Sequence, residues 1–407
     1  MNCRHCDMPL SNTFLDLGYA PPSNAYLNFE SLSKPEKYYP LKVMVCTECW
    51  LVQTEDYAEV GELFSADYAY FSSTSSSWLA HAEIFAKTVI ERLQLNHTSS
   101  VIEIASNDGY LLRNFVDAGI PCLGIEPTAG TADAAELLGI PVIREFFCEK
   151  LGMQLAARQQ QADLIIGNNV YAHVPNINDF TLGMKAALKQ NGTITLEFPH
   201  IMSLIEQVQF DTIYHEHFSY LSLYTVARIF NSVGLRIWDV EQLPTHGGSL
   251  RIYGCHKGDM RKNTKAVGEI LAKEYQYGLQ TISIFQNFQV LVDQVKDSLL
   301  IFLIEQKRAK KKVVAYGAAA KGNTLLNYAG VKPDLINYVF DAALAKQGKY
   351  MPGSHIPILP PNELITCAPD YLLILPWNIA EEVKLQNKDL IGQGTKFITV
   401  IPQLRQI

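Results

Sequence analysis

The stretch VIEIASNDG at residues 101–109 decides the fold. Its first five residues are mostly apolar and branched, which predicts a buried strand, and SNDG predicts a tight turn. The sequence YLL at residues 110–112 then predicts the start of a helix. The same alternation of strand and helix recurs to residue 198, and such alternation is typical of an α/β domain with a parallel sheet and crossover helices.

The rest of this sheet can be placed from the same signals. Two last strands, at residues 235–240 and 249–254, follow in hairpin order, which is the layout of a class I methyltransferase sheet. Ligands of open α/β sheets bind beyond the carboxyl ends of the strands, so we expect the functional groups there. The other expected elements are strands at 122–126, 141–143, 163–167 and 193–198 and helices at 129–138 and 179–188.

Polar residues at three strand ends predict a cofactor site. Glu126 ends the second strand, where a carboxylate can bind a ribose diol. The turn has no G-x-G-x-x-G pattern, because Ala105 and Ser106 stand where a dinucleotide binder has glycines. This favours an adenosyl ligand without a pyrophosphate over NAD, with an ordinary strand-turn-helix corner as the alternative. The expected cofactor-binding residues are Glu103, Ser106, Asn107, Asp108, Gly109, Glu126, Asn168 and Asn169.

The densest group of ionisable side chains is YHEHFSY at residues 214–220. It falls in the crossover between the fifth and sixth strands, above the same carboxyl edge and near the adenosyl site. A histidine there can act as a general base, because the imidazole pKa lies near working pH. The alternatives are an exposed polar loop, or His215 and His217 as metal ligands, although the sequence shows no nearby partner set.

Two Cys-x-x-Cys pairs near the N-terminus predict a metal site. Such pairs can bring four thiolates to one centre. So small a segment has little core of its own, and a metal would supply folding energy. We expect structural Zn²⁺, because four protein ligands leave no open position; a redox or incidental pair of knuckles is the alternative. The expected ligands are Cys3, Cys6, Cys46 and Cys49.

The C-terminal segment begins with VVAYGAAAKGNT at residues 313–324. A strand, a small-residue turn and a helix with one lysine make an anion site from helix N-terminal amides plus a charge. A phosphate-bearing substrate held with Lys321 is the preferred ligand, and a degenerate Rossmann unit is the alternative. Before it, residues 260–308 show helical spacing and are expected to form a long helical connector.

Length and charge bound the class of protein. At 407 residues the chain should hold more than one domain. Its net charge of −7 argues against broad nucleic-acid or membrane binding, and no apolar run is long enough to span a bilayer. The N-terminus has no signal pattern, so we expect a cytoplasmic protein. The expected division is a zinc-binding domain at 1–65, a methyltransferase domain at 66–258, a connector at 259–308 and a Rossmann-like domain at 309–407.

The order of these motifs resembles the family of sugar C-methyltransferases that make 3-C-methylated deoxysugars. The motifs are the four cysteines, EIASNDGYLL, NNVYAHVPN, YHEHFSY, THGGSLR and YGAAAKGNTLLN, and the resemblance covers essentially the whole chain. It implies S-adenosylmethionine as cofactor, zinc on the four cysteines, and a nucleoside-diphospho-4-keto-6-deoxyhexose substrate, commonly dTDP-linked. It also implies that the C-terminal domain helps hold the sugar nucleotide. The catalytic groups that the resemblance implies are Tyr68, His173, Tyr214, Glu216 and His217.

The chemistry assigns these residues roles. His217 is expected to be the base, oriented by Glu216 or by a backbone carbonyl. His173 and Tyr214 are expected to donate to the developing oxyanion, and Tyr68 to close over the reacting groups. His215 is the reserve base, because it would share a face with His217 on a regular strand. The expected substrate-binding residues are His215, Tyr220, His246, Lys321 and Asn323.

Two other functions are compatible with the sequence. An O- or N-methyltransferase of another small metabolite would need the same adenosyl site without enolate chemistry. A zinc-knuckle scaffold with a degenerate enzyme fold would not bind S-adenosylmethionine. A monomer is favoured, although the helical connector could also pair two chains.

Overall fold

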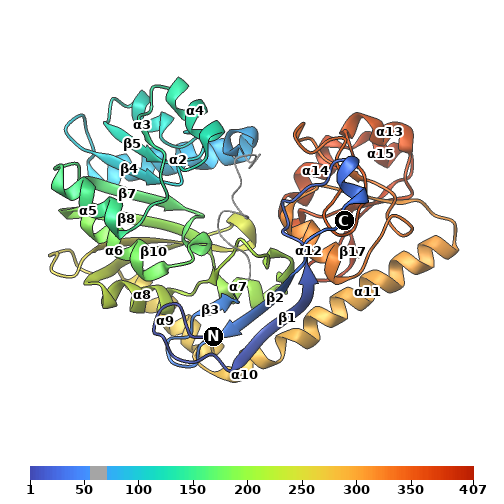
Figure 1. The fold of residues 1–407 in the computed structure, drawn as a ribbon, viewed down its shortest axis with the longest axis horizontal. Helices are drawn as coiled ribbons and strands as arrows, with labels where there is room; N and C mark the ends of the chain where they lie inside the picture. The colour runs from blue at the N-terminus through green and yellow to red at the C-terminus, as the bar shows by residue number, and fades with distance from the viewer. Residues whose placement is uncertain (56–70) are drawn as a thin grey trace.

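The computed structural model describes residues 1–55 and 71–407 of the chain. Over these residues it contains sheets of four, seven and six strands. Figure 1 shows the seven-stranded sheet in one lobe and the C-terminal sheet in another, with the N-terminal strands and the long helix α11 (Phe288–Arg308) running below and between them. The predicted α/β class, with a four-cysteine unit and two Rossmann-like sheets, is confirmed.

The seven-stranded sheet has the order β10-β11-β8-β7-β4-β5-β6. β11 lies antiparallel between β8 and β10, and the other neighbours pair in parallel, as a methyltransferase sheet requires. Its strands are β4 (Val101–Ile104), β5 (Cys122–Ile125), β6 (Val142–Ile143), β7 (Ala162–Asn168), β8 (Leu188–Pro199), β10 (Leu235–Leu243) and β11 (Ser249–His256). Its helices are α2 (Ser76–Leu93), α3 (Arg113–Asp117), α4 (Ala129–Leu137), α5 (Glu149–Ala157), α6 (Ile177–Ala187), α7 (Ile201–Glu206) and α8 (Leu223–Ser232).

Two helical predictions differ from the structure. Residues 110–112 form turns, and α3 begins only at Arg113. The predicted connector is three helices, α9 (Lys265–Tyr277), α10 (Ile282–Gln286) and α11. Gly278 ends α9 because its φ of 95° lies in the left-handed region, where glycine has no Cβ penalty.

The four-stranded sheet joins segments that are far apart in the sequence. Its order is β1-β2-β3-β9, with β1 (Asn12–Ala20), β2 (Tyr39–Val45), β3 (Val52–Thr54) and β9 (Ser219–Tyr220). β9 is the end of the YHEHFSY cluster and pairs antiparallel with β3. The N-terminal sheet therefore holds one end of the loop that carries the predicted catalytic residues.

The C-terminal sheet is parallel except at one edge. Its order is β14-β13-β12-β15-β16-β17, and only β17 is antiparallel to its neighbour within this sheet. The segment before β13 is a turn, in which the amides of Leu335 and Ile336 donate to the Lys332 carbonyl. The elements are β12 (Val313–Tyr316), α12 (Ala320–Tyr328), β13 (Val339–Phe340), β14 (Ile358–Leu359), α13 (Leu364–Cys367), β15 (Tyr371–Ile374), α14 (Ala380–Gln386), α15 (Asp389–Gly392), β16 (Lys396–Thr399) and β17 (Arg405–Gln406).

Residues 21–38, between β1 and β2, reach across to the C-terminal lobe. Leu27 forms a β-bridge with Tyr350, and Glu36 accepts hydrogen bonds from the Gly353 amide and from Nε2 of His355, each at 2.8 Å. In Figure 1 this blue segment lies on the C-terminal lobe. The N-terminal region thus contacts both Rossmann-like sheets.

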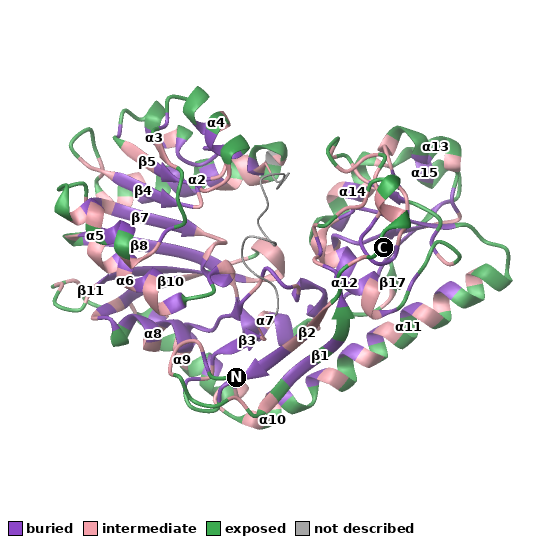
Figure 2. Cartoon of the chain, in the orientation of Figure 1, coloured by how far each residue is buried: buried purple, intermediate pink, exposed green. Residues whose placement is uncertain are grey.

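The apolar core follows the same connections. One cluster contains Leu15 of β1, Val292 of α11 and Ala315 of β12, so the N-terminal and C-terminal sheets share it. A second cluster places Cys46 and Cys49 with side chains under the seven-stranded sheet. Figure 2 shows β4, β7 and β8 largely buried, and α11 with exposed turns on its outer side. None of the described helices is long and apolar enough to span a membrane.

The crossing of α5 and α6 depends on two glycines. A Cβ on Gly152 would lie 2.2 Å from the Gly183 carbonyl oxygen, so the helices meet backbone to backbone. Alanine normally stabilises a helix by about 1 kcal/mol relative to glycine, but overpacking costs about 1–3 kcal/mol. We expect Gly152→Ala to lower the free energy of unfolding by about 1–2 kcal/mol in urea titrations, since the clash is with backbone.

The matched control is Gly268→Ala in α9, where an added Cβ has no atom within 4 Å. This variant should gain about 0.5–1 kcal/mol. Equal effects of the two substitutions would contradict the proposed backbone contact.

Candidate active site and metal centre

The four predicted cysteines form a metal centre. Their sulfur atoms all lie within 4.8 Å of one another. The distances are 3.5 Å between Cys3 and Cys49 and 3.5 Å between Cys6 and Cys46. Sulfurs at the corners of a tetrahedron around zinc are about 3.8 Å apart. The geometry therefore fits one Zn²⁺, which would be enclosed by protein ligands and would serve folding.

The surroundings favour the thiolate at Cys3, whereas burial raises the pKa of Cys6 and the contact with Cys3 raises that of Cys49. The contact with the Cys49 thiol lowers the pKa of Cys3 to about 4, and Nε2 of Gln53 donates to its sulfur at 3.2 Å. Zinc binds the deprotonated sulfur, so a group poised as thiolate suits the metal.

Removing one cysteine ligand should both release the zinc and lower the thermal stability of the protein. We expect Cys49→Ser to lose its zinc, measured by elemental mass spectrometry, and to lower Tm by at least about 5 °C, because metal-binding free energy is folding free energy. Cys367→Ser, at a half-buried thiol outside the cluster, should keep the metal and the Tm. Full zinc content in Cys49→Ser would contradict the assignment.

The residues predicted to bind the cofactor lie at the strand ends, and several of them have buried polar atoms without a protein partner in the described part of the chain. Among the described residues, buried atoms without a protein partner include Oε2 of Glu103, Oγ of Ser106, Oδ1 of Asp108, Oδ1 of Asn168 and both amide atoms of Asn169. Burial, with the nearby carboxylates of Asp108 and Glu126, raises the pKa of Glu103 well above its ordinary value. Buried acceptors need donors, and the hydroxyl and ammonium groups of S-adenosylmethionine supply them. The residues at this edge thus fit that cofactor.

The turn has the backbone that such a cofactor site needs. Ala105, Asn107 and Gly109 all have positive φ values, of 57°, 50° and 78°. Glu126 accepts from the Asn107 amide at 3.0 Å and so holds the turn itself. The amide of Ser72 donates to Oδ1 of Asn107 at 2.9 Å, which lays the segment after residue 70 over the turn.

Tyr68, the predicted lid residue, lies outside the described residues.

The predicted catalytic cluster is a turn followed by β9. The amide of His217 donates to the Tyr214 carbonyl at 2.9 Å, so the loop is not a regular strand. The His217 ring lies 4.0 Å from the Tyr214 ring, 4.6 Å from the His173 ring and 6.1 Å from the Tyr220 ring, measured between centroids. Four predicted residues therefore meet in one place.

The protonation state of His217 is set by the backbone. Its Nδ1 donates to the Thr212 carbonyl at 2.7 Å, which leaves Nε2 with a free lone pair. Burial and the nearby His173 hold the pKa of His217 well below its usual range. A neutral imidazole with an accessible Nε2 can accept a proton from carbon near pH 7.

Glu216 is held from the N-terminal region. Nδ2 of Asn24 donates to its carboxylate at 2.8 Å. The sequence left open whether Glu216 or a backbone carbonyl orients His217; the carbonyl of Thr212 does so. The His173 ring bonds to the Glu216 backbone, and burial lowers the pKa of His173 to about 4.

His215 points away from His217. Its Nε2 lies 3.2 Å from the Pro40 carbonyl on β2, and burial lowers its pKa. The expectation that His215 and His217 share a face fails here, because the turn breaks the alternation of a strand.

Two predicted substrate-binding residues, Lys321 and His246, lie near the cluster but belong to other elements. Lys321 of α12 donates to Oδ1 of Asn378 at 2.7 Å, and its Nζ lies 4.7 Å above the Trp377 ring. Burial and the charge of Lys321 lower the pKa of His246 to about 4, so the two groups are close. Asn323 is buried, and its Oδ1 accepts from Asn327 at 3.0 Å within the helix.

Two buried groups near the site were not predicted. Asp211 accepts from Nε1 of Trp377 at 2.8 Å, and burial raises its pKa to about 6. Glu197 lies near the end of β8. Its Oε2 accepts a hydrogen bond from Nη2 of Arg251 at 2.6 Å and lies 3.0 Å from Nε2 of His81. A charged residue within an apolar strand, as in ITLEF, is a signal that could have found Glu197.

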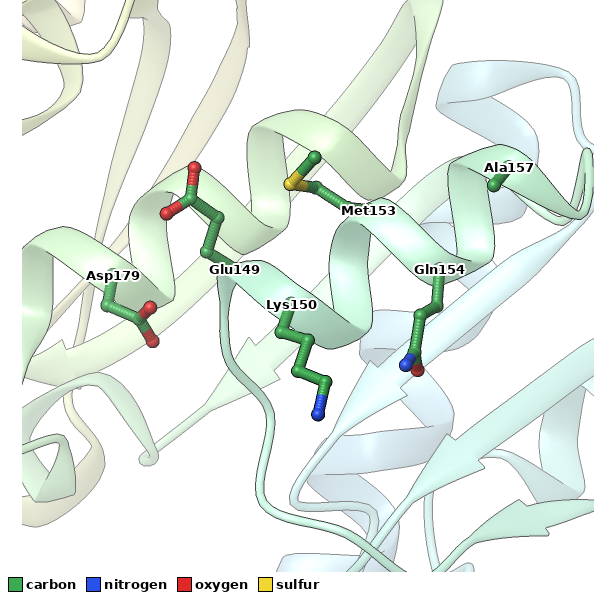
Figure 3. A pocket seen from close by; sticks show the side chains of 6 residues that line it. All are labelled: Glu149, Lys150, Met153, Gln154, Ala157 and Asp179. Carbon is green, nitrogen blue, oxygen red and sulfur yellow. The ribbon is translucent and has the colours of Figure 1, made fainter.

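A hollow on the outer surface carries no such chemistry. It has a volume of about 440 Å³ and lies on α5 and α6. Figure 3 shows the side chains that line it, which are Glu149, Lys150, Met153, Gln154, Ala157 and Asp179. None of them belongs to the expected site.

Comparison with known proteins agrees with this arrangement. The chain matches models of a zinc binding domain over residues 3–64, a methyltransferase domain over 78–240 and a C-methyltransferase C-terminal domain over 244–402. It is 33% identical over 405 residues to the C-methyltransferase NovU of Streptomyces niveus, covering 100% of this chain and 96% of that one.

Solved structures give weaker matches. Magnesium protoporphyrin IX methyltransferase from Synechocystis with bound SAH has 12% identity and a TM-score of 0.36, covering 44% of this chain and 83% of that chain. A SAM-dependent methyltransferase from Anabaena variabilis has 13% identity and a TM-score of 0.38, covering 50% and 97%. At these scores nothing further about this chain follows from them.

The fold, the matched family models and the C-methyltransferase relative together define this chain as an S-adenosylmethionine-dependent C-methyltransferase with a zinc-binding domain. The chain belongs to the sugar C-methyltransferase family that its motifs indicate.

The ion pair of Glu197 should govern part of the acid stability. Burial alone would raise the pKa of Glu197, but the contacts with His81 and Arg251 lower it from 4.5 to about 2. A lowered folded pKa stabilises the protein above pH 4.5, and this stability is lost as the pH falls toward 2. Glu197→Gln removes the nearer carboxylate of the buried Arg251 and leaves it with Glu241 at 3.6 Å, so the variant should be less stable than wild type at neutral pH.

The gap in unfolding free energy between wild type and Glu197→Gln should narrow by about 2 kcal/mol between pH 5.5 and pH 3. Urea titrations at several pH values measure it, with the exposed Glu363→Gln as control. A gap that does not change with pH would show that Glu197 is not held ionised by these contacts.

Proposed function

We propose that the chain transfers a methyl group from S-adenosylmethionine to C3 of a nucleoside-diphospho-4-keto-6-deoxyhexose, with His217 as the base that removes the C3 proton. The observation that carries this proposal is the fixed tautomer of His217, whose Nδ1 bonds to Thr212 while Nε2 keeps its lone pair. The family, and the NovU relative described as a C-methyltransferase, support methylation at carbon.

Methylation at carbon needs a carbon nucleophile. A ketone at C4 makes the hydrogen on C3 acidic, and its removal gives an enolate whose C3 can attack a methyl group. The cofactor supplies a methyl on a sulfonium, which leaves as a neutral sulfide. The protein must supply a base, a donor for the enolate oxygen and alignment of the two reactants.

The geometry favours Tyr214 as the oxyanion donor. His173 was expected to share that role, but burial keeps it neutral near pH 7 and its ring bonds to the Glu216 backbone. A neutral imidazole has one N–H, so once it donates to a carbonyl it can only accept. We therefore assign the donor role to the Tyr214 hydroxyl and give His173 the role of holding the loop beside His217.

The nucleotide end of the substrate would lie on the C-terminal domain. Lys321 is near Asp211, His246 and His217, as its effects on their pKa values show. It stands in the first turn of α12, where a helix N-terminus favours a phosphate. We propose that residues 309–407 hold the sugar nucleotide by this lysine and helix terminus.

The base should account for a defined part of the rate. A positioned base contributes about 10²–10⁴ in rate and an oxyanion donor about 10²–10³. His217→Asn should therefore lower kcat by at least about 10²-fold with little change in the Kd of S-adenosylmethionine, measured by calorimetry. Full activity of His217→Asn would contradict the assignment of the base.

The reaction itself is tested by mass spectrometry in D₂O with dTDP- and GDP-linked 4-keto-6-deoxy sugars. We expect a gain of one methylene on a sugar nucleotide together with S-adenosylhomocysteine. A methyl found on oxygen or nitrogen would contradict C-methylation. Absence of any product from protein that binds the cofactor would contradict the proposed acceptor class.

A further inference from the structure

The carbonyl that orients His217 lies between two residues bound to the C-terminal lobe. Thr212 follows Asp211, whose Oδ2 accepts from Nε1 of Trp377 at 2.8 Å. It precedes Ile213, whose carbonyl accepts from Oγ1 of Thr324 at 2.8 Å. Trp377 and Thr324 come from different elements of the C-terminal lobe, the short helix Trp377–Ile379 and α12.

The Thr324 contact is shielded from water, and the Trp377 contact is partly buried. Asp211 and Ile213 are fully buried, and Thr324 is 2% exposed. Oδ1 of Asp211 has no protein partner among the described residues, so Trp377 is the side-chain donor that the structure gives this carboxylate. Loss of a buried hydrogen-bond partner costs about 1–3 kcal/mol, so each contact can hold the loop strongly.

Trp377 is itself fixed between the lobes. A Cβ on Gly247 would lie 2.4 Å from Cη2 of Trp377, so the indole packs directly against the backbone of the methyltransferase lobe. Nζ of Lys321 lies over the same ring, 4.7 Å from its centroid. Its N–H therefore has little freedom to leave Asp211.

We propose that Thr324 and Trp377 are positioning residues, which clamp Asp211–Ile213 from the C-terminal lobe and thereby fix the Thr212 carbonyl that orients His217. The inference rests on the proposed function in that His217 is taken as the base. It gives the C-terminal lobe a part in catalysis besides holding the substrate. A displacement of about 1 Å in such a group can cost about 10²-fold in rate.

The first test needs no substrate. Full-length, zinc-loaded protein labelled with ¹⁵N at histidine gives imidazole signals, and the His217 signal is assigned by its absence from His217→Asn. Wild type should show the Nδ1–H tautomer. Thr324→Val removes the hydroxyl at nearly constant volume and should give a mixture of tautomers. Thr324→Ser keeps the hydroxyl and should restore the wild-type signal.

The second test is the pH dependence of kcat/KM. The groups that face His217 are His173, His246, Lys321, Tyr214 and Tyr220, with Asp211 on its own loop. A loosened loop admits water, so the pKa of His217 rises toward its ordinary value and the acid limb moves to higher pH. We expect this shift in Thr324→Val and in Trp377→Phe, with kcat reduced about 10-fold to 10²-fold and the KM for S-adenosylmethionine unchanged.

The control is Thr366→Val, because Thr366 Oγ1 donates to the Glu363 carbonyl at 2.9 Å in the same lobe but away from the loop. It should match wild type in both tests. The inference is overturned if Thr324→Val and Trp377→Phe keep the wild-type His217 signal, or if activity falls with no shift of the acid limb. Since the spectra need no substrate, this failure is distinct from failure of the proposed reaction, which His217→Asn reports.

Discussion

In the proposed reaction, the hydrogen bond from Nδ1 of His217 to the Thr212 carbonyl determines what the site can do. It places the proton on the nitrogen that faces the protein and leaves the lone pair on the other. Burial then keeps the ring neutral, since the pKa lies well below its usual range. With the opposite tautomer the same histidine would present a donor, and proton abstraction from carbon would need another group.

This bond belongs to a short irregular loop that the N-terminal region and the C-terminal lobe both support. β9 at its end pairs with β3 of the N-terminal sheet, and Asn24 from the same region holds Glu216. Thr324 bonds to it from the C-terminal lobe. The metal centre has no part in the proposed reaction, but it packs close to the loop. Cys49 shares a core cluster with Leu221 and Leu223, just beyond β9. Zinc thereby supports the sheet on which the loop rests.

The fold and the metal centre could be predicted from the sequence, but the direction of His215 and the contacts that support the loop could not. The strand-turn-helix cycle and the cysteine spacing are local patterns, so the α/β fold class and the metal centre could be predicted. The side-chain direction of His215 could not, because it depends on a turn held by contacts with β2. Nor could the support of the loop, since Asn24, Thr324 and Trp377 reach it from positions more than 100 residues away in sequence. Such partners leave no local periodicity.

The most direct test of the central claim is a structure of the zinc-loaded chain with S-adenosylhomocysteine and an intact 4-keto-6-deoxy sugar nucleotide. The account predicts that C3 of the sugar lies roughly 3 Å from Nε2 of His217. The C4 oxygen should lie within reach of the Tyr214 hydroxyl, and the sulfur should face C3. A sugar whose C3 faces a different basic group, or a His217 whose Nε2 bonds to protein instead, would contradict it.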